Sequence, residues 1–323
     1  MTERRPTAEG VEAAAKRVAP NVVRTPLLPF SWEGVRLWVK AECLQEGGSF
    51  KLRGATNRLL LLDEAERERG VVAFSSGNHA QGVAIAARRL GIRATIVMPS
   101  DAPAVKRDST LAAGAEVVAY DRATESREAI AARLAAERGA VLVPSFDDVD
   151  VIEGQGSVGI EIAEQLGAAP DRVLVPCGGG GLSAGIALAL PESRIVTVEP
   201  EGWDDMARSI EAGEPLPVVE PPPPTRCDAL QTRLVSALTL AALRESRASG
   251  LWVTEAEIER AMAFAARHLR IVAEPGGAVA LAALLAGRAG PVTGRTVVVV
   301  SGGNVDPELY AAILGAQAAD AGR

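Results

Sequence analysis

The sequence predicts an α/β fold in which parallel sheets carry helices on both faces. From about residue 70 onward, short apolar runs alternate with helical patterns, and this repeated order is typical of parallel strands joined by helical crossovers. Apolar residues make up 48% of the chain and aromatic residues only 3%, which favours a core of Ala, Val, Leu and Ile. A length of 323 residues suits two domains.

The apolar runs predict strands, and the patterns between them predict helices. The predicted strands cover residues 71–74, 94–98, 116–119, 140–143, 172–176, 194–198 and 296–300. The helices between them cover residues 79–90, 104–113, 125–137, 153–166, 182–190 and 203–212. Two further helices, 230–246 and 255–269, follow without a clear strand between them, and Thr254 and Glu257 form a capping box for the second. The proline-rich segment 215–224 cannot be helical and predicts a surface crossover.

Composition argues against several classes of function. A net charge of −7 disfavours nonspecific nucleic-acid binding, which needs clustered Lys and Arg. No window approaches the ~18 apolar residues of a membrane span, and the polar start of the chain lacks the apolar stretch of a signal peptide. Three widely spaced cysteines, Cys43, Cys177 and Cys227, favour a reducing compartment. A cytoplasmic protein without nucleic-acid or membrane partners is therefore expected.

Lys51 stands between two apolar residues, Phe50 and Leu52, at the predicted first turn of a helix. Ser49 is expected to cap this helix, which places Lys51 near the positive end of the helix dipole. Burial and a positive potential both lower the pKa of an amine, and a partly neutral lysine can form a Schiff base with a carbonyl. The alternative is a surface lysine whose stem covers apolar area.

Three loops that follow predicted strands gather polar residues or glycines at the sheet edge where ligands bind in open α/β folds. They are Ser75-Ser76-Gly77-Asn78-His79, Cys177-Gly178-Gly179-Gly180-Gly181 and Ser301-Gly302-Gly303-Asn304. The glycine run lets backbone N–H groups converge on a phosphate, although a tight turn or a dinucleotide loop outside the G-x-G-x-x-G register would also explain it. The first loop suits a carboxylate or an elaborate N-cap, and Ser301 offers a neutral hydroxyl.

Together with Lys51, these loops closely resemble those of the fold-type II pyridoxal-phosphate enzymes, specifically the serine/threonine dehydratase and serine racemase family. The resemblance spans nearly the whole chain. It implies a tryptophan synthase β-like fold with two open, twisted, mainly parallel sheets flanked by helices. Residues 1–61 and 148–323 would form a large cofactor-binding domain, and residues 62–147 a small mobile substrate-binding domain. Family members are usually dimers, so a homodimer is expected.

The resemblance also implies how pyridoxal 5′-phosphate would be held. Lys51 would bind it as a Schiff base and later move the α-proton of the substrate, with Phe50 behind the ring. Asn78 would contact the ring hydroxyl and Ser301 the pyridine nitrogen. The phosphate would be bound by the backbone N–H groups of Gly178, Gly179, Gly180, Gly181 and Leu182.

Two further sites are implied by the resemblance. The substrate carboxylate would be received by Ser75, Ser76, Gly77, Asn78 and His79. The family's divalent-cation site is matched by Glu199, Asp205 and the carbonyl of Trp203. Such hard oxygen ligands suit Mg²⁺ or Ca²⁺.

The implied activity is that of an L-serine/L-threonine dehydratase, an ammonia-lyase that gives pyruvate or 2-oxobutyrate plus ammonia by α,β-elimination. A neutral Ser301 beside the pyridine nitrogen favours elimination over transamination. Ser76 stands where racemases carry a serine on the opposite face of the cofactor, which leaves serine racemase open, as well as L-threo-3-hydroxyaspartate dehydratase. Arg127, after Ser126, matches a racemase-like position or is a solvated helix residue. A nicotinamide (NAD)-dependent oxidoreductase is the alternative from another class.

Overall fold

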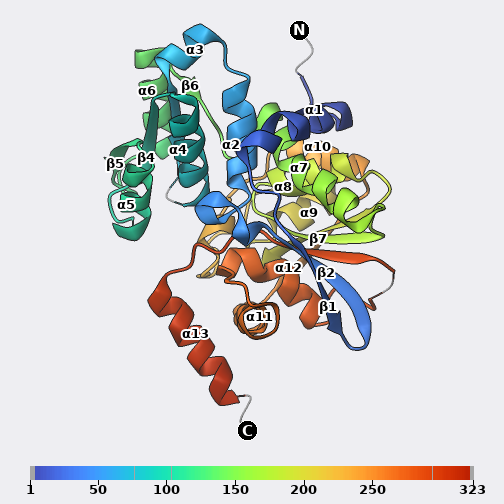
Figure 1. The fold of residues 1–323 in the computed structure, drawn as a ribbon. Coiled ribbons are helices and arrows are strands. Elements are labelled where there is room, and N and C mark those ends of the chain that lie inside the picture. Colours follow the sequence, from blue (N-terminus) through green and yellow to red (C-terminus); the bar gives the residue numbers. More distant parts are fainter. Residues whose placement is uncertain (1–3, 76, 103, 293, 321–323) are drawn as a thin grey trace.

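The chain folds into two sheets that lie on opposite sides of helix α2 (Lys51–Leu60) in the computed structural model (Figure 1). The structure describes residues 4–75, 77–102, 104–292 and 294–320. One sheet has six strands and the other has four. The predicted α/β class, with mainly parallel sheets flanked by helices, is confirmed.

The larger sheet has its strands in the order β1-β2-β10-β7-β8-β9. These strands are β1 (Leu27–Trp32), β2 (Val35–Ala41), β7 (Arg172–Pro176), β8 (Arg194–Pro200), β9 (Ser249–Val253) and β10 (Thr296–Val300). β1 and β2 form an antiparallel hairpin, whereas the remaining pairs are parallel. Successive side chains of β10 pack into the hydrophobic cores on opposite faces of the sheet, Val297 and Val299 on one face and Val298 and Val300 on the other. Both faces are therefore buried, as in a doubly covered parallel sheet.

The helices of this part of the molecule lie on both sides of the larger sheet, some of them in a second layer. They are α1 (Ala8–Val18), α7 (Val149–Leu166), α8 (Gly181–Ala189), α9 (Asp205–Ala212), α10 (Ala237–Glu245), α11 (Glu255–Phe264), α12 (Pro275–Leu285) and α13 (Pro307–Asp320). α7, α8 and α10 share a core with one face, and α11 and α12 share a core with the other. Short helical turns lie at η1 (Ala19–Asn21), η2 (Glu42–Leu44), η3 (Glu46–Gly48) and η4 (Asp228–Leu230), and a π-helical turn, η5 (Ala265–Leu269), extends α11.

The smaller sheet is entirely parallel, in the order β5-β4-β3-β6. Its strands are β3 (Val71–Phe74), β4 (Ala94–Pro99), β5 (Glu116–Tyr120) and β6 (Val141–Leu142). The helices of this part are α3 (Glu64–Arg69), α4 (Asn78–Leu90), α5 (Ala104–Ala112) and α6 (Arg127–Arg138). α4 packs between this sheet and α2, so that the start of α4 lies close to Lys51. The exact bounds of the two predicted domains stay a prediction.

The structure corrects the predicted elements in two places. The helix predicted over residues 230–246 begins only at Ala237, because the side chain of Ser236 accepts a hydrogen bond from the N–H of Leu238 and caps it there. β9 separates this helix from α11, where the sequence analysis expects no clear strand. The capping box of Thr254 and Glu257 is confirmed at the start of α11. Within the described ranges, no helix combines the length and apolar character needed to cross a membrane.

Candidate active site

Backbone pairing brings Lys51 and Ser301 together, although they are far apart in the sequence. The segment before α2 pairs with the segment after β10: the Phe50 N–H donates to the Ser301 carbonyl at 3.2 Å, and the Gly303 N–H donates to the Gly48 carbonyl at 2.9 Å. A bridge between Ser49 and Gly302 completes this pairing. The start of α2 therefore lies at the carboxyl end of a central strand, where open α/β sheets bind their ligands.

The expectation that Ser49 caps α2 is wrong. The helix begins at Lys51, its N-cap is Phe50, and no side chain makes a capping hydrogen bond there. Ser49 is extended, with φ −162° and ψ 162°, because it pairs with Gly302. The start of α2 is thus held by tertiary contacts in place of a cap.

The amine of Lys51 points into a cavity. Its Nζ donates a hydrogen bond of 2.9 Å to the carbonyl of Ser145 and lies 5.1 Å from the centre of the Phe50 ring. Burial lowers the pKa of the Lys51 amine from 10.5 to about 8. About a tenth of the amine is then uncharged at pH 7, and this neutral form can attack a carbonyl.

The glycine run forms the wall of the same cavity, between β7 and α8. A Cβ atom added to Gly179 would lie 2.4 Å from the ring of Phe146, and one added to Gly180, whose φ is +88°, would lie 2.5 Å from Met206. Gly180 is also the N-cap of α8, and no side chain caps this helix. The free N–H groups at an uncapped helix start fit an anion such as a phosphate, so these residues fit the phosphate of the implied cofactor.

The cavity brings together all the residues that the sequence predicts to bind the cofactor. Its lining includes Phe50, Lys51, Asn78, Gly178, Gly179, Gly180, Gly181, Leu182 and Ser301. It also includes residues without a predicted role, namely Ser145, Phe146, Pro176, Ala229, Leu230, Thr232 and Glu274. Of these, Glu274 carries the clearest sequence signal, because an acidic residue directly precedes a Pro-Gly-Gly helix start.

Asn78 links the first turn of α4 to two loops of the larger sheet. Its Nδ2 donates to the buried Glu274 carboxylate at 2.6 Å, and its Oδ1 accepts from Asn304 Nδ2 at 2.8 Å. Asn304 also donates to the Gly47 carbonyl at 2.7 Å. These bonds fix the orientation of the Asn78 amide at the wall of the cavity.

The remaining members of the predicted carboxylate loop lie differently. Ser76 lies outside the described residues. Ser75 Oγ accepts from the Gly77 N–H at 3.2 Å, and neither residue lines the described cavity. His79 does not line it either: its Nε2 lies 2.8 Å from the Val143 carbonyl, and burial followed by the charge of Lys51 lowers the pKa of His79 to about 3. His79 is therefore a neutral, buried imidazole.

The residues predicted to hold a metal ion gather at the end of β8. Both oxygens of Glu199 accept backbone N–H bonds, from Met206 and Ala207 at 2.8 Å, whereas both oxygens of the buried Asp205 find no hydrogen-bond partner among the described residues. Burial and the facing Asp205 raise the pKa of Glu199 well above its ordinary value, and burial raises the pKa of Asp205 to about 7.

Two buried carboxylates that form no ion pair within the described part of the chain fit a cation, because an uncompensated buried charge is costly. The described residues contain no group of three or more His, Cys, Asp and Glu side chains placed to hold a metal. A cation here would thus need backbone carbonyls or water as further ligands. Trp203 is nearly buried, and its indole N–H is bonded to the Pro223 carbonyl at 2.9 Å, which leaves only its own carbonyl to consider.

Arg127 lies beside the carboxyl end of β3. Ser126 caps α6 by accepting from the Ala129 N–H at 3.2 Å, which makes Arg127 the first residue of the helix. The Arg127 guanidinium carbon lies 5.6 Å from the centre of the Phe74 ring, and its Nε is 2.8 Å from Glu128. Phe74 directly precedes the Ser75 loop in the chain, and Arg127 is an exposed cation beside the Phe74 ring.

Comparison with known proteins supports one family over most of the chain. Residues 18–303 match the family model described as "Pyridoxal-phosphate dependent enzyme". Two proteins named L-threo-3-hydroxyaspartate ammonia-lyase are similar to this chain. The one from Pseudomonas sp is 43% identical over 309 residues, 93% of this chain and 96% of that protein, and the one from Saccharomyces cerevisiae is 39% identical over 317 residues, 96% of each.

Solved structures agree with this match. A threonine deaminase from T.th. is 42% identical, with a TM-score of 0.86 over 93% of this chain and 99% of that chain. The serine racemase of maize is 35% identical, with a TM-score of 0.89 over 99% of this chain and 100% of that chain. The cavity that holds Lys51 and the glycine run agrees with these matches. The chain belongs to the fold-type II family of pyridoxal-phosphate-dependent enzymes, which includes amino-acid ammonia-lyases and racemases.

Proposed function

We propose that this protein is a pyridoxal-phosphate-dependent L-threo-3-hydroxyaspartate ammonia-lyase, which converts its substrate into oxaloacetate and ammonia. The main support for this chemistry is the Lys51 amine, which donates a hydrogen bond to the Ser145 carbonyl in the cavity lined by the glycine run. The substrate is supported by the two similar ammonia-lyases, which favour 3-hydroxyaspartate over the serine and threonine that the sequence analysis ranks first.

The predicted cofactor-binding residues of the cavity have distinct chemical tasks in this proposal. Lys51 would bind the cofactor covalently, and its amine, once released, would accept the α-proton of the substrate. The N–H groups from Gly178 to Leu182 would hold the phosphate at the start of α8. The Ser301 hydroxyl would contact the ring nitrogen without adding charge. When bound, pyridoxal phosphate supplies a conjugated ring that stabilises negative charge at the substrate Cα.

A substrate with two carboxylates needs two places for negative charge. The loop from Ser75 to Asn78 would receive the α-carboxylate, with backbone N–H groups at the start of α4. The β-carboxylate would be received by Arg127, whose planar guanidinium suits bidentate binding and which lies beside Phe74, the residue before that loop. This arginine supports a dicarboxylate substrate and is less useful for serine or threonine.

A divalent cation, Mg²⁺ or Ca²⁺, is proposed at Glu199 and Asp205, with the Trp203 carbonyl. The support is the Asp205 carboxylate, which is buried and lacks a hydrogen-bond partner among the described residues. A cation would balance two carboxylates that otherwise need protons to stay buried. This site lies behind the glycine cradle, because Met206 of α9 contacts Gly180.

Serine racemisation is a second candidate. Its support is the hydroxyl of Ser76 in the sequence Ser75-Ser76-Gly77-Asn78-His79 and the similarity to the maize serine racemase. Ser76 would then exchange the α-proton on the face opposite Lys51.

A cytoplasmic location and a homodimer are also proposed. Buried free thiols at Cys43, Cys177 and Cys227 support a reducing compartment.

Substrate assays test the proposal. Purified protein with added pyridoxal phosphate is incubated with L-threo-3-hydroxyaspartate, L-serine, D-serine or L-threonine, with and without Mg²⁺, and keto acid and enantiomer are measured. The expected result is the highest kcat/KM for 3-hydroxyaspartate, with release of oxaloacetate and ammonia. Keto acid from serine or threonine alone would contradict the proposed substrate, and D-serine as the main product from L-serine would establish the racemase.

A further inference from the structure

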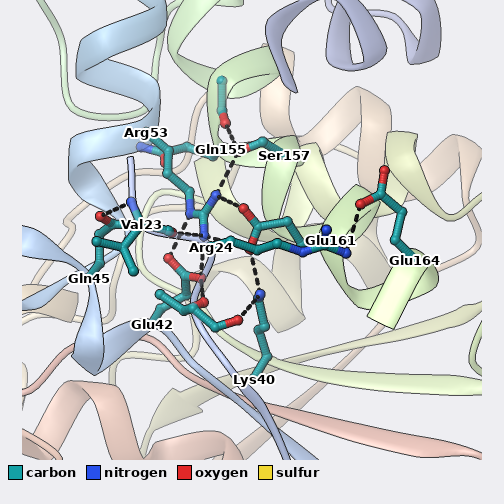
Figure 2. A network of polar contacts seen from close by, with 12 residues as sticks. Val23, Arg24, Lys40, Glu42, Gln45, Arg53, Gln155, Ser157, Glu161 and Glu164 are labelled. Carbon is teal, nitrogen blue, oxygen red and sulfur yellow. Dashed lines mark hydrogen bonds and ion pairs between the residues drawn. The ribbon is translucent and has the colours of Figure 1, made fainter. Parts of the chain in front are cut away.

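A buried ion network lies directly beneath the turn that carries Lys51. Arg53 is completely buried, and its guanidinium forks between two carboxylates, as Figure 2 shows. Its Nε and Nη2 each donate a hydrogen bond of 2.8 Å to Glu42, and its Nη1 and Nη2 donate hydrogen bonds of 2.7 and 2.9 Å to Glu161. These bonds join α2 to the turn η2 on one side and to α7 on the other.

Lys40 of β2 completes the network. Its Nζ contacts Glu161, as Figure 2 shows, at 2.5 Å. It also lies 2.8 Å from the Thr25 carbonyl and 2.9 Å from Gln165. Two cations thus face two carboxylates. Burial alone would lower the pKa of Arg53, but Glu42 and Glu161 raise it, so the guanidinium stays charged. Because burying charge costs free energy that ion pairing only partly returns, such a network is weak evidence for stability and better evidence for a specified geometry.

Backbone pairing before Lys51 and apolar packing of Leu52 also hold the first turn of α2 in place. No side chain caps it. The Gly54 N–H donates to Gln155 Oε1 of α7 at 3.1 Å, and a Cβ on Gly82 of α4 would lie 2.9 Å from the Lys51 carbonyl carbon. The turn is therefore clamped between α4 and α7. Both contacts are made by backbone groups close to the helix axis, whereas the bidentate bonds of Arg53 lie further from that axis and are strongly directional.

Arg53 can therefore fix how far α2 is rotated about its own axis. Successive residues of an α-helix are turned by about 100°, so residues 51 and 53 project about 200° apart, on opposite sides of α2. Lys51 faces the cavity, and Arg53 faces Glu42 and Glu161. A planar fork with two bidentate partners tolerates little rotation.

We propose that Arg53 is a positioning residue for Lys51, holding α2 at the rotation that keeps the Lys51 amine buried against the Ser145 carbonyl. The inference rests on the proposed attachment of the cofactor to Lys51, but it can be tested on cofactor-free protein. The titratable groups that face Lys51 are His79 of α4, which is neutral, and Glu274, which lines the same cavity. Neither belongs to the network. A substitution in the network is therefore expected to affect the Lys51 amine by changing the position of α2, and not by removing a charge that faces the amine.

The test compares variants of the full-length protein without cofactor. Acylation of Lys51 by an amine-reactive reagent is measured by peptide mass spectrometry over a series of pH values, and binding of pyridoxal phosphate is then titrated. Arg53→Lys keeps the charge but removes the planar fork. Lys40→Met is the matched control, since it removes the other cation of the network from β2 and leaves α2 untouched. Thermal unfolding of each variant is recorded alongside.

The wild-type labelling midpoint is expected at about 8. In Arg53→Lys the midpoint should rise by about one pH unit as water reaches the amine, and pyridoxal phosphate should bind about tenfold more weakly. Lys40→Met should lower thermal stability but leave the midpoint and the affinity within about twofold of wild type, because the fork to Glu42 and Glu161 remains.

Two outcomes would overturn the inference: a folded Arg53→Lys protein with wild-type midpoint and affinity, or equal shifts in Lys40→Met. If Arg53→Lys does not fold, Glu42→Gln takes its place, because it preserves shape and one acceptor while it weakens the fork. A shift in the same direction supports the inference, and an unchanged midpoint in folded Glu42→Gln rejects it. If wild type binds no pyridoxal phosphate, the proposed function fails, while the labelling midpoints still decide the role of Arg53.

Discussion

At the scale of single residues, burial determines the chemistry. Lys51 is the cation that the sequence places among apolar neighbours, and the structure surrounds its amine with a carbonyl and an aromatic ring in place of a carboxylate. Lys40 and Arg53 are also buried, but each is paired with carboxylates. A buried amine without a carboxylate partner loses its charge more readily than a paired one, which distinguishes a nucleophile from a structural cation.

Replacement of Lys51 by Ala should remove covalent cofactor binding. Wild-type protein loaded with pyridoxal phosphate is expected to absorb near the violet edge of the visible and to lose that band on treatment with borohydride. Lys51→Ala should lack the band and lose at least about 10³-fold in kcat, because the nucleophile and the base are the same group. Retained activity in a correctly folded Lys51→Ala protein would show that another residue removes the α-proton.

Uptake of pyridoxal phosphate by the cofactor-free protein should depend on the neutral form of Lys51. With a pKa of about 8, the rate should rise about tenfold per pH unit below that value and level off above it, which stopped-flow absorbance can follow. The same burial costs folding free energy below about pH 8, where the folded protein carries a buried charge, and this cost fades as pH rises toward the ordinary value of 10.5. A rate independent of pH over this window would reject the assignment.

Arg127 should select for a second carboxylate. Arg127→Met is expected to lower kcat/KM for L-threo-3-hydroxyaspartate by roughly ten- to hundredfold, the effect of one lost charged hydrogen bond, and to change that for L-serine much less. Arg133→Met is the matched control, because Arg133 lies on the same helix and pairs only with the exposed Glu137 among the described residues. Equal losses for both substrates would mean that Arg127 serves folding instead of recognition.

At the scale of elements, the termini of helices carry the site. α2, α4 and α8 all begin at the cavity, and no side chain makes a capping hydrogen bond at their starts. Uncapped helix starts leave backbone N–H groups for anions. At the start of α8, Phe146 and Met206 lie too close to Gly179 and Gly180 to leave room for a side chain. These glycines are therefore needed for close packing, and not only for backbone flexibility.

Replacement of Gly179 by Ala should therefore damage the cradle. The new methyl group would lie 2.4 Å from the Phe146 ring, and overpacking of about 1–3 kcal/mol is expected to weaken pyridoxal phosphate binding by roughly tenfold or more. Fluorescence titration of the cofactor measures the effect. Gly315→Ala is the control, since Gly315 lies in α13 with open space around it and should gain slightly in stability. Wild-type affinity in Gly179→Ala would mean that the loop can shift freely.

Most strands of the parallel sheets and the helices between them could be predicted from hydrophobic periodicity, and two of the missed features, α12 and the β1–β2 hairpin, have physical reasons. α12 is buried all round, so it shows no amphipathic pattern. β1 and β2 contain a proline and charged residues because the hairpin lies at a sheet edge, and only its Glu33-Gly34 turn, with positive φ at both residues, signals it. The cavity glycines and Lys51 can be recognised in the sequence, whereas Ser145 and Thr232 contribute through tertiary placement alone.

At the scale of the whole molecule, two sheets lie on either side of α2 (Figure 1). The cavity is lined by residues of both parts, such as Asn78 and Ser301. Glu199, near the end of β8, and Asp205, at the start of α9, lie behind the glycine cradle, because Met206 of α9 contacts Gly180. A cation bound there would act on global stability as well as on the cradle, because it binds only the folded arrangement of these carboxylates.

Mg²⁺ or Ca²⁺ should therefore raise the melting temperature. At a concentration of about 100 times the Kd, the stabilisation should reach about 2.7 kcal/mol, and chelator should reverse it. Asp205→Asn should be more stable than wild type in chelator, since it removes a buried carboxylate that has no hydrogen-bond partner within the described ranges, and it should lose the response to the cation. Asp204→Asn, at the more exposed neighbouring position, serves as control. A melting temperature indifferent to both cations would contradict the proposed site.

The bonds of Asn78 have a mechanical consequence for the smaller sheet. Glu274 and Asn304, both from the larger part of the molecule, hold the amino-terminal end of α4, whereas its far end at Leu90 packs within the smaller part. Any swing of the four-stranded sheet would thus turn about a pivot at Asn78. The parts of α3 and α5 that lie furthest from Asn78 would move most, and the peptide groups nearest Lys51 would move least. The cavity could then open toward the smaller sheet while the residues around Lys51 keep their positions.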